Sequence, residues 1–159
     1  MDSMNQHEQK KPYARFAAMV AVSTVVMFGL MYLNTYEVDH VFFSQTRAWM
    51  ALVMGSTMAA IMLGFMSHML THRGANIGIL IVSGVVFAIS LWLVRSQSTV
   101  DDVSYMRAMI PHHSIAILTS TRARIQDARV RKLADEITET QKKEIAEMSA
   151  LIRDLDAQR

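Results

Sequence analysis

Hydrophobic and polar positions divide the chain into a long apolar part and a shorter amphipathic part. The apolar part contains three stretches without Asp, Glu, Lys or Arg, at residues 16–36, 48–71 and 74–94. Each stretch exceeds the roughly 20 residues that a helix needs to cross a hydrocarbon core. Aromatic residues near their ends are typical of membrane interfaces. The pattern therefore predicts three transmembrane helices.

Beyond residue 99 the apolar positions follow a helical period. The first helix is predicted to begin near a capping box formed by Ser98 and Asp101, and Pro111 is expected to kink or restart it. A second helix is predicted from Asp127, a good N-cap, to about Leu155. Folded back as an antiparallel hairpin, the helices place Met106 opposite Met148 and His113 opposite Gln141, in a register that can slip by one turn. The predicted fold class is all-α.

Charge gives the domain organisation and the orientation. Residues 1–15 are predicted to be a cytoplasmic segment, 16–94 the transmembrane domain, 95–99 a linker, and 100–159 an extracytoplasmic domain.

Lys10, Lys11 and Arg15 precede the first span, which is too long for a signal peptide and lacks a cleavage site, so an uncleaved anchor is expected. These cations place the N-terminus in the cytoplasm. We expect a bacterial cytoplasmic (inner) membrane, with the last domain in the periplasm.

Composition excludes several classes of function. The 159 residues include 14 Met and no Cys, which excludes a disulfide scaffold and thiolate metal sites. A formal net charge of +2 and the absence of a nucleic-acid-binding motif argue against a nucleic-acid partner. No nucleophile with a base and an orienting group is recognisable, and no phosphate-binding Gly loop. We therefore expect a protein that is not an enzyme.

Methionine and histidine gather in the predicted hairpin. Met106, Met109 and His113 share one helical face, with His112 beside them, and Met148 lies on the facing helix with Gln141 and Glu144. Thioether and imidazole donors without thiolates suit Cu(I) or Ag(I) better than Mg²⁺, Ca²⁺ or Zn²⁺. The alternative is that the methionines fill the core and that His113 is a buried histidine bonded to Gln141 or Glu144. From the residues alone the two interpretations are about equally supported.

Two stretches also resemble a known family. They are Met106-Arg-Ala-Met109-Ile-Pro-His-His113 and Gln141-x-x-Glu144-Ile145-x-x-Met148. Over about residues 100–156 the chain resembles the family catalogued as domain of unknown function 305. The resemblance implies a ferritin-like helical bundle and, as for the family's periplasmic members, binding of copper and silver that supports metal tolerance. Thr119 and Leu151 stand where the family commonly has Met and an aromatic residue.

Two weaker candidates lie in the membrane part. Six methionines follow the second span, five of them at intervals of four residues: Met50, Met54, Met58, Met62, Met66 and Met69. Packing in a tight helix interface is the favoured interpretation, and a ladder of sulfurs that conducts a soft ion is the alternative. His68 and His72 are spaced i, i+4 and could chelate a metal at the cytoplasmic membrane edge.

A two-helix hairpin cannot bury its apolar stripe alone, so we expect a homo-oligomer, a dimer or higher, that completes a four-helix bundle. The predicted function is membrane-anchored, extracytoplasmic binding of Cu(I) or Ag(I) for buffering or tolerance, with an unknown metal donor or acceptor protein. Met106, Met109, His113 and Met148 are the expected ligands, His112 a ligand or neighbour, and Gln141 and Glu144 the groups that orient histidine. The alternatives are a structural module without metal and a small metal-conducting membrane protein.

Overall fold

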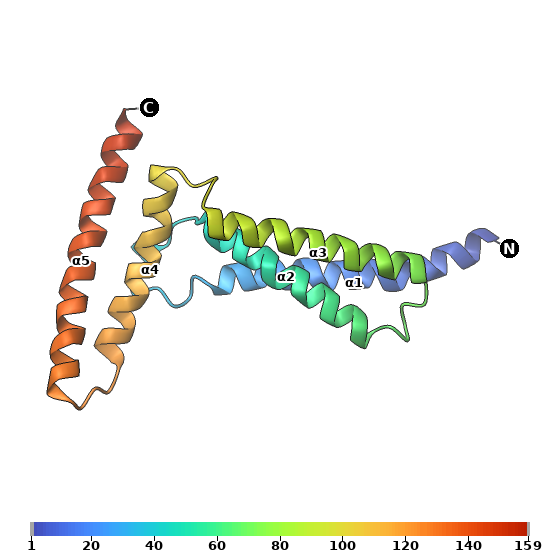
Figure 1. The fold of residues 1–159 in the computed structure, drawn as a ribbon, viewed down its shortest axis with the longest axis horizontal. Helices are drawn as coiled ribbons and strands as arrows, with labels where there is room; N and C mark the ends of the chain where they lie inside the picture. Colours follow the sequence, from blue (N-terminus) through green and yellow to red (C-terminus); the bar gives the residue numbers. More distant parts are fainter. Residues whose placement is uncertain (1, 159) are drawn as a thin grey trace. The chain divides into compact units, whose positions relative to one another are not determined.

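The structure is a computed structural model that describes the backbone of residues 2–158 and the side chains of residues 11–158. Within that range all regular structure is helical, in the order α1 (Asp2–Leu30), η1 (Val38–His40), α2 (Gln45–Phe65), α3 (Arg73–Ser96), α4 (Asp102–Arg122) and α5 (Ala128–Ala157) (Figure 1). The predicted all-α class is therefore confirmed. Contacts divide the chain into two compact units: the first holds α1, α2 and α3, and the second holds α4, α5 and residues 31–45.

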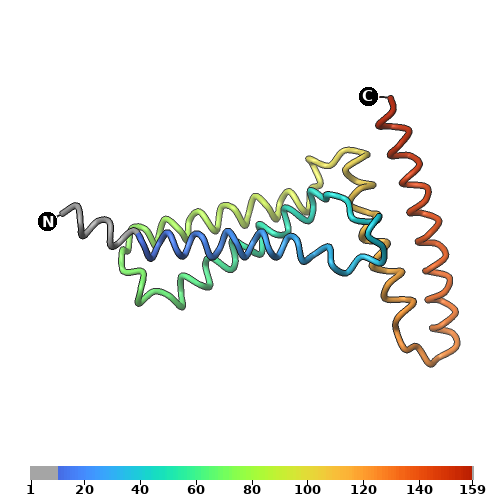
Figure 2. Tube along the Cα trace, turned by 180° about the vertical axis from the view of Figure 1, so that it is seen from behind, coloured from blue at the N-terminus to red at the C-terminus, as the bar shows by residue number. Residues whose placement is uncertain are grey.

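Three helices of the first unit are long and apolar enough to cross a membrane. These segments are Lys11–Leu30, Gln45–Phe65 and Arg73–Ser96. The three helices run side by side in both views of the chain (Figures 1 and 2). Three candidate spans were predicted from the sequence, and all three are found.

The first two spans end earlier than the charge-free stretches suggested. Helix α1 ends at Leu30, and the following residues turn, with the Thr35 hydroxyl donating to the Tyr32 carbonyl over 2.9 Å. Helix α2 ends at Phe65, after which Leu70 folds back and becomes completely buried. The charge-free stretches thus locate the spans but not their ends, because turns can be made from uncharged residues and a span can begin or end with a charged one.

Small residues bring α1 and α2 together. A Cβ added at Gly55 of α2 would overlap the Thr24 side chain of α1. One helical turn further on, Ala59 and Leu63 pack with Phe16 of α1 in a buried cluster. Close approach through small residues is a common means of helix association in lipid.

The second unit contains the predicted antiparallel hairpin, in which α4 and α5 lie side by side (Figure 1). Asp127 caps α5 as expected and accepts from the backbone N–H groups of Arg129 and Val130. The N-terminus of α4 differs from the prediction: Asp101 is itself the N-cap and accepts from the N–H of Ser104 over 2.7 Å. The predicted capping box that starts at Ser98 is therefore wrong, because α4 begins one turn later than expected.

The hairpin has an apolar core made by both helices. Its buried members are Val103, Met106, Ile110 and Ile117 of α4 with Ile145 and Ile152 of α5. Helix α4 is continuous through Pro111, so the restart considered for this position does not occur. Pro111 is fully buried. Burial of its apolar ring stabilises the hairpin, which offsets the hydrogen bond that is lost because proline has no N–H donor.

Residues 31–45 fold onto α4, as Figure 2 also shows. The hydroxyl of Ser114, which is 0% exposed, accepts from the backbone N–H of Tyr36 over 2.7 Å and lies 3.0 Å from Nδ1 of His40. Phe42 packs against the apolar core of the hairpin. Residues 31–45, which the hydropathy pattern assigned to the membrane domain, thus pack with the hairpin domain.

Candidate functional site

A groove of about 680 Å³ runs along the seam between α4 and α5. The α4 side is lined by Asp102, Tyr105, Met106, Met109 and His113. The α5 side and C-terminus contribute Glu144, Glu147, Met148, Leu151, Asp154, Leu155 and Gln158. Most of the donors singled out from the sequence therefore line one concave surface.

Three methionines lie in this groove, together with the apolar side chains of Leu151 and Leu155. Met106 is buried in the hairpin core, whereas Met109 and Met148 are half-buried. Met148 lines the groove from the facing helix and packs against the core cluster that contains Met106. Met106 and Met109 lie on the same side of the groove because residues three apart share one face of a helix.

His113 is the nitrogen donor of the groove, and its side chain is 13% exposed. Its Nδ1 lies 3.0 Å from Oε2 of Glu144, at ion-pair distance but without hydrogen-bond geometry. The predicted partner Gln141 is replaced by Glu144, which corresponds to the one-turn slip of register along α5. Burial lowers the pKa of His113, the nearby Glu144 carboxylate partly opposes this, and His112 lowers it further. The lowered pKa favours the neutral imidazole, the form that binds metals.

Carboxylates give the groove a negative field. Asp102, Glu144, Glu147 and Asp154 line it, and no Lys or Arg is among its described lining residues. A concave surface with charges of one sign concentrates ions of the opposite sign. The groove thus combines a field that attracts cations with soft donors at its apolar side.

Two predicted residues do not reach the groove. His112 is exposed and meets His113 edge-on, with 5.9 Å between ring centroids. Gln141 is half-buried but does not line the groove. Thr119, at the position where the family commonly has Met, also lies outside it, and its hydroxyl donates to carbonyls of its own helix. Across residues 11–158, moreover, no three His, Asp or Glu side chains come close enough together to hold a metal ion.

The weaker histidine pair is not arranged on one helix. His68 lies after the end of α2, and His72 is the N-cap of α3, where its Nδ1 accepts from the N–H of Ala75 over 3.1 Å. The i, i+4 spacing therefore does not create a chelating pair on a helical face.

The second-span methionines flank the packed face of α2. That face consists of Ala51, Gly55, Ser56, Ala59 and Leu63. Met62 and Met66 pack against the buried cluster, whereas Met50, Met54 and Met69 are exposed. The methionines thus only partly fill a helix interface within one chain.

Of the groove's carboxylates, Glu144 was singled out from the sequence but Asp102, Glu147 and Asp154 were not, and neither was His40. Glu144, Glu147, Leu151 and Asp154 are spaced by three, four and three residues, so helical periodicity could have placed all of them on the groove side of α5. His40 lies in an irregular segment, where no periodic pattern indicated that it would pack against α4.

The fold and the groove define a helical protein with three membrane-length helices and a helical-hairpin domain. Within that class, the profile of the domain of unknown function (DUF305) matches residues 102–159. A similar protein is the uncharacterized protein L153 of Acanthamoeba polyphaga mimivirus, which is 34% identical over 102 residues, covering 60% of this chain and 67% of L153. The chain belongs to the DUF305 family. The match to L153 is longer than residues 102–159 and so extends beyond the hairpin domain.

No solved structure matches the chain.

Proposed function

We propose that the groove between α4 and α5 binds Cu(I) or Ag(I). The observation that carries the proposal is that three thioethers and one imidazole line the same groove: Met106, Met109, His113 and Met148. The role is binding, for buffering or tolerance, and requires no catalytic group.

The donor types select the class of metal. Thioether sulfur and neutral imidazole favour soft monovalent ions, whereas Mg²⁺ and Ca²⁺ require several oxygen ligands. The donor set thus fits a soft ion better than a hard or borderline one.

Glu144 serves to orient the imidazole. A metal-binding histidine commonly donates its second ring N–H to a carboxylate, which fixes the tautomer and raises the basicity of the ligating nitrogen. Oε2 of Glu144 lies 3.0 Å from Nδ1 of His113 without the geometry of a hydrogen bond, so this hydrogen bond must form when an ion binds at Nε2. Gln141, outside the groove, has no role in this arrangement.

Location and assembly complete the proposal. Three membrane-length helices anchor the domain, and the cations before the first span favour a cytoplasmic N-terminus and a periplasmic hairpin at a bacterial inner membrane. Exposed apolar side chains on α5, namely Val130, Leu133, Ile137 and Leu151, support pairing of hairpins into a four-helix bundle. Thioether ligands suit this compartment because they do not form disulfides.

Competition between the full-length protein and a Cu(I) chelator tests the proposal. We expect the Met106→Leu, Met148→Leu double variant to lose on the order of tenfold or more in affinity, which corresponds to about 1.4 kcal/mol per tenfold step. The matched control, Met54→Leu with Met58→Leu, changes two methionines of α2 and should bind as the wild type does. Binding weaker than micromolar, or equal affinity in the groove variant, contradicts the proposal.

The same control tests the alternative of an ion-conducting membrane protein. If the second-span stripe held the ion, the Met54→Leu, Met58→Leu variant would lose binding and the groove variant would keep it. A structural module without metal predicts that neither protein binds Cu(I) and that groove substitutions alter assembly instead. The exposed apolar face of α5 is the observation that favours this last candidate.

A further inference from the structure

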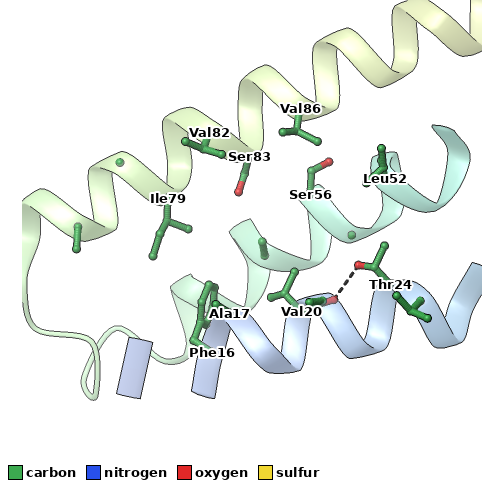
Figure 3. Close-up of a pocket in the computed structure, with 16 residues that line it drawn as sticks. Phe16, Ala17, Val20, Thr24, Leu52, Ser56, Ile79, Val82, Ser83 and Val86 are labelled. Carbon is green, nitrogen blue, oxygen red and sulfur yellow. Dashed lines mark hydrogen bonds between the residues drawn. The ribbon is translucent and has the colours of Figure 1, made fainter. Parts of the chain in front are cut away.

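Concave surfaces occur in both units of the chain. One of about 720 Å³ lies among α1, α2 and α3 (Figure 3), and its described lining is apolar apart from the hydroxyls of Thr24, Ser56 and Ser83. An acyl chain or an apolar helix would cover it equally well, so nothing in its lining selects one occupant. The groove between α4 and α5 differs because carboxylates line it, and charge can select a partner.

The groove between α4 and α5 continues into an exposed apolar strip on α5. Seven side chains recur along this one uninterrupted helix at intervals of three, four or seven residues and therefore share a face: Val130, Leu133, Ile137, Glu144, Met148, Leu151 and Leu155. We call this set the outer stripe of α5. The side chains that α5 buries stand one position after members of the outer stripe, at Ala134, Thr138, Ile145 and Ile152. The outer stripe therefore lies beside the hairpin core.

The two halves of the outer stripe differ. Its C-terminal half, from Glu144 to Leu155, lines the groove that α5 forms with α4. In its N-terminal half, Val130, Leu133 and Ile137 are exposed apolar side chains that lie outside the groove. One chain thus carries a groove and, further along the same face, apolar side chains of the kind that mark a contact with a partner.

Charge is distributed unequally between the two ends of the hairpin domain. His113 of α4 and Glu144 of α5 approach to 3.0 Å, so they mark one level across the hairpin. Toward the turn between the helices, residues 113–143 contain seven Lys or Arg and four Asp or Glu. Toward the groove, residues 99–112 and 144–158 together contain two Lys or Arg and six Asp or Glu. The turn end of the domain is therefore net positive, and the groove end is net negative.

We propose that the N-terminal half of α5 from a second chain closes the groove, with the two α5 helices antiparallel. Leu133 and Leu151 stand nine residues on either side of Lys142, so a two-fold axis at that level brings Leu133 of each chain to Leu151 of the other. The positive turn end of each hairpin then covers the negative groove end of the other. A parallel pair would instead place ends of like charge together, which is unfavourable.

The second chain completes the proposed metal site, so this inference rests on the proposed function. Met109 and Met148 are only half-buried in one chain, which leaves both sulfur donors open to water. Apolar side chains of the second chain exclude this water, and its exposed Arg129 and Lys132 offset the charge of the groove carboxylates. Each pair of chains contains two closed grooves. Because closure favours binding of the ion, the ion favours pairing of the chains by the same factor.

Cysteine cross-linking of the full-length protein tests the arrangement, because the chain has no Cys of its own. With a metal-free oxidant, the Leu133→Cys, Leu151→Cys variant should shift to twice the mass of one chain. Leu133→Cys alone should not, because antiparallel helices hold its two copies about 27 Å apart, whereas a disulfide needs Cα atoms within about 7 Å. Leu133→Cys with Arg153→Cys is the matched control, since Arg153 is exposed on the other side of α5 at the level of Leu151, and it should not cross-link. A dimer cross-linked by Leu133→Cys alone, or none in the first variant, overturns the proposal.

Copper affinity gives the second arm and separates this inference from the proposed function. Leu133→Gln with Ile137→Gln changes no residue of the groove and adds no charge. In chelator competition it should nevertheless lower the Cu(I) affinity of the full-length protein at least about fivefold, the lower end of common coupling between two binding events. Ala146→Gln, exposed on the opposite face of α5, is the control and should bind as the wild type does.

The two arms fail in different ways. If the wild type binds Cu(I) and the Leu133→Gln, Ile137→Gln variant binds it equally well, closure by a second chain is overturned while the metal site stands. If the wild type forms the cross-link between positions 133 and 151 but binds no Cu(I), the proposed function is contradicted and the antiparallel pairing is supported.

Discussion

Opposing electrostatic effects act on the pKa of the His113 imidazole. Burial disfavours the protonated form, the Glu144 carboxylate favours it, and His112 disfavours it again. The net result is a pKa below the ordinary value of 6.5, because burial is the largest of the three. A proton and a metal ion compete for the same ring, so this balance also determines how metal binding depends on pH.

Acidification should therefore weaken Cu(I) binding through His113 alone. Well above the lowered pKa the ring is neutral and the affinity is constant. As the pH falls below that pKa, the affinity should fall by up to about tenfold per pH unit. Chelator competition at a series of pH values measures this. His113→Gln should bind more weakly and show no such slope, because thioethers carry no proton. A wild-type affinity that does not change between pH 7 and pH 4 would show that His113 is not a ligand.

The same pKa shift bears on the stability of the hairpin. Since the folded pKa of His113 lies below its unfolded value, the unfolded chain binds more protons in the interval between them, and stability rises with pH there. This contribution is complete above pH 6.5 and is lost as the pH falls through the folded pKa.

Helix α4 has two packing faces. One carries the apolar core and the groove shared with α5, and the other carries Ser114, which holds residues 31–45 through Tyr36 and His40. Ser114 follows His113 directly in the sequence. The segment 31–45 thus supports the stretch of α4 from which the proposed ligand projects.

Ser114→Ala should release this segment from α4. The Tyr36 N–H would lose its acceptor, and loss of such a hydrogen bond costs about 0.5–1.5 kcal/mol. Hydrogen exchange of residues 36–40 should become faster, and the free energy of unfolding should fall. Thr119→Ala is the control, because the Thr119 hydroxyl is exposed and bonds only to carbonyls of α4. Equal exchange rates in the two variants would contradict the account of Ser114.

Packing of α1 on α2 depends on the absence of a side chain at Gly55. Gly55→Leu places atoms where Thr24 already lies, and overpacking of this kind costs about 1–3 kcal/mol. The thermal midpoint in detergent should fall. Gly64→Leu in the same helix meets nothing within 4 Å at its Cβ and should leave the midpoint unchanged. A similar midpoint for both variants would be inconsistent with close contact between α1 and α2.

Periodicity predicted the helices and much of the groove, but not every packing partner. The i, i+3 and i+7 spacing of Met106, Met109 and His113 was sufficient to place them together, and the matching stripe on α5 supplied Met148. Residues 31–45 lack a period, and hydropathy gives no information on where an irregular segment packs. The span ends at Leu30 and Phe65 were missed for a similar reason, since uncharged turn residues resemble the spans that they follow.

For the whole molecule, the exposed apolar face of α5 predicts self-association. Leu133 is 55% exposed and Ile137 is 36% exposed. Most other residues of α5 that lie outside the hairpin core are charged. Leu133→Glu with Ile137→Glu should shift the full-length protein toward monomers in light scattering with detergent correction. Ala146→Glu, at an exposed position on another face of α5, should not. A wild type that is already monomeric, or an unaffected double variant, would refute the predicted bundle.

The central claim is that α4 and α5 together hold a soft metal ion through sulfur and imidazole. X-ray absorption spectroscopy of the full-length protein loaded with one equivalent of Cu(I) tests it most directly, because residues 31–45, which pack on α4, are then present. We expect sulfur neighbours together with one imidazole nitrogen, and loss of the sulfur signal in the Met106→Leu, Met109→Leu, Met148→Leu variant. A copper ion surrounded only by nitrogen and oxygen, or a sulfur signal that survives these substitutions, would contradict the account.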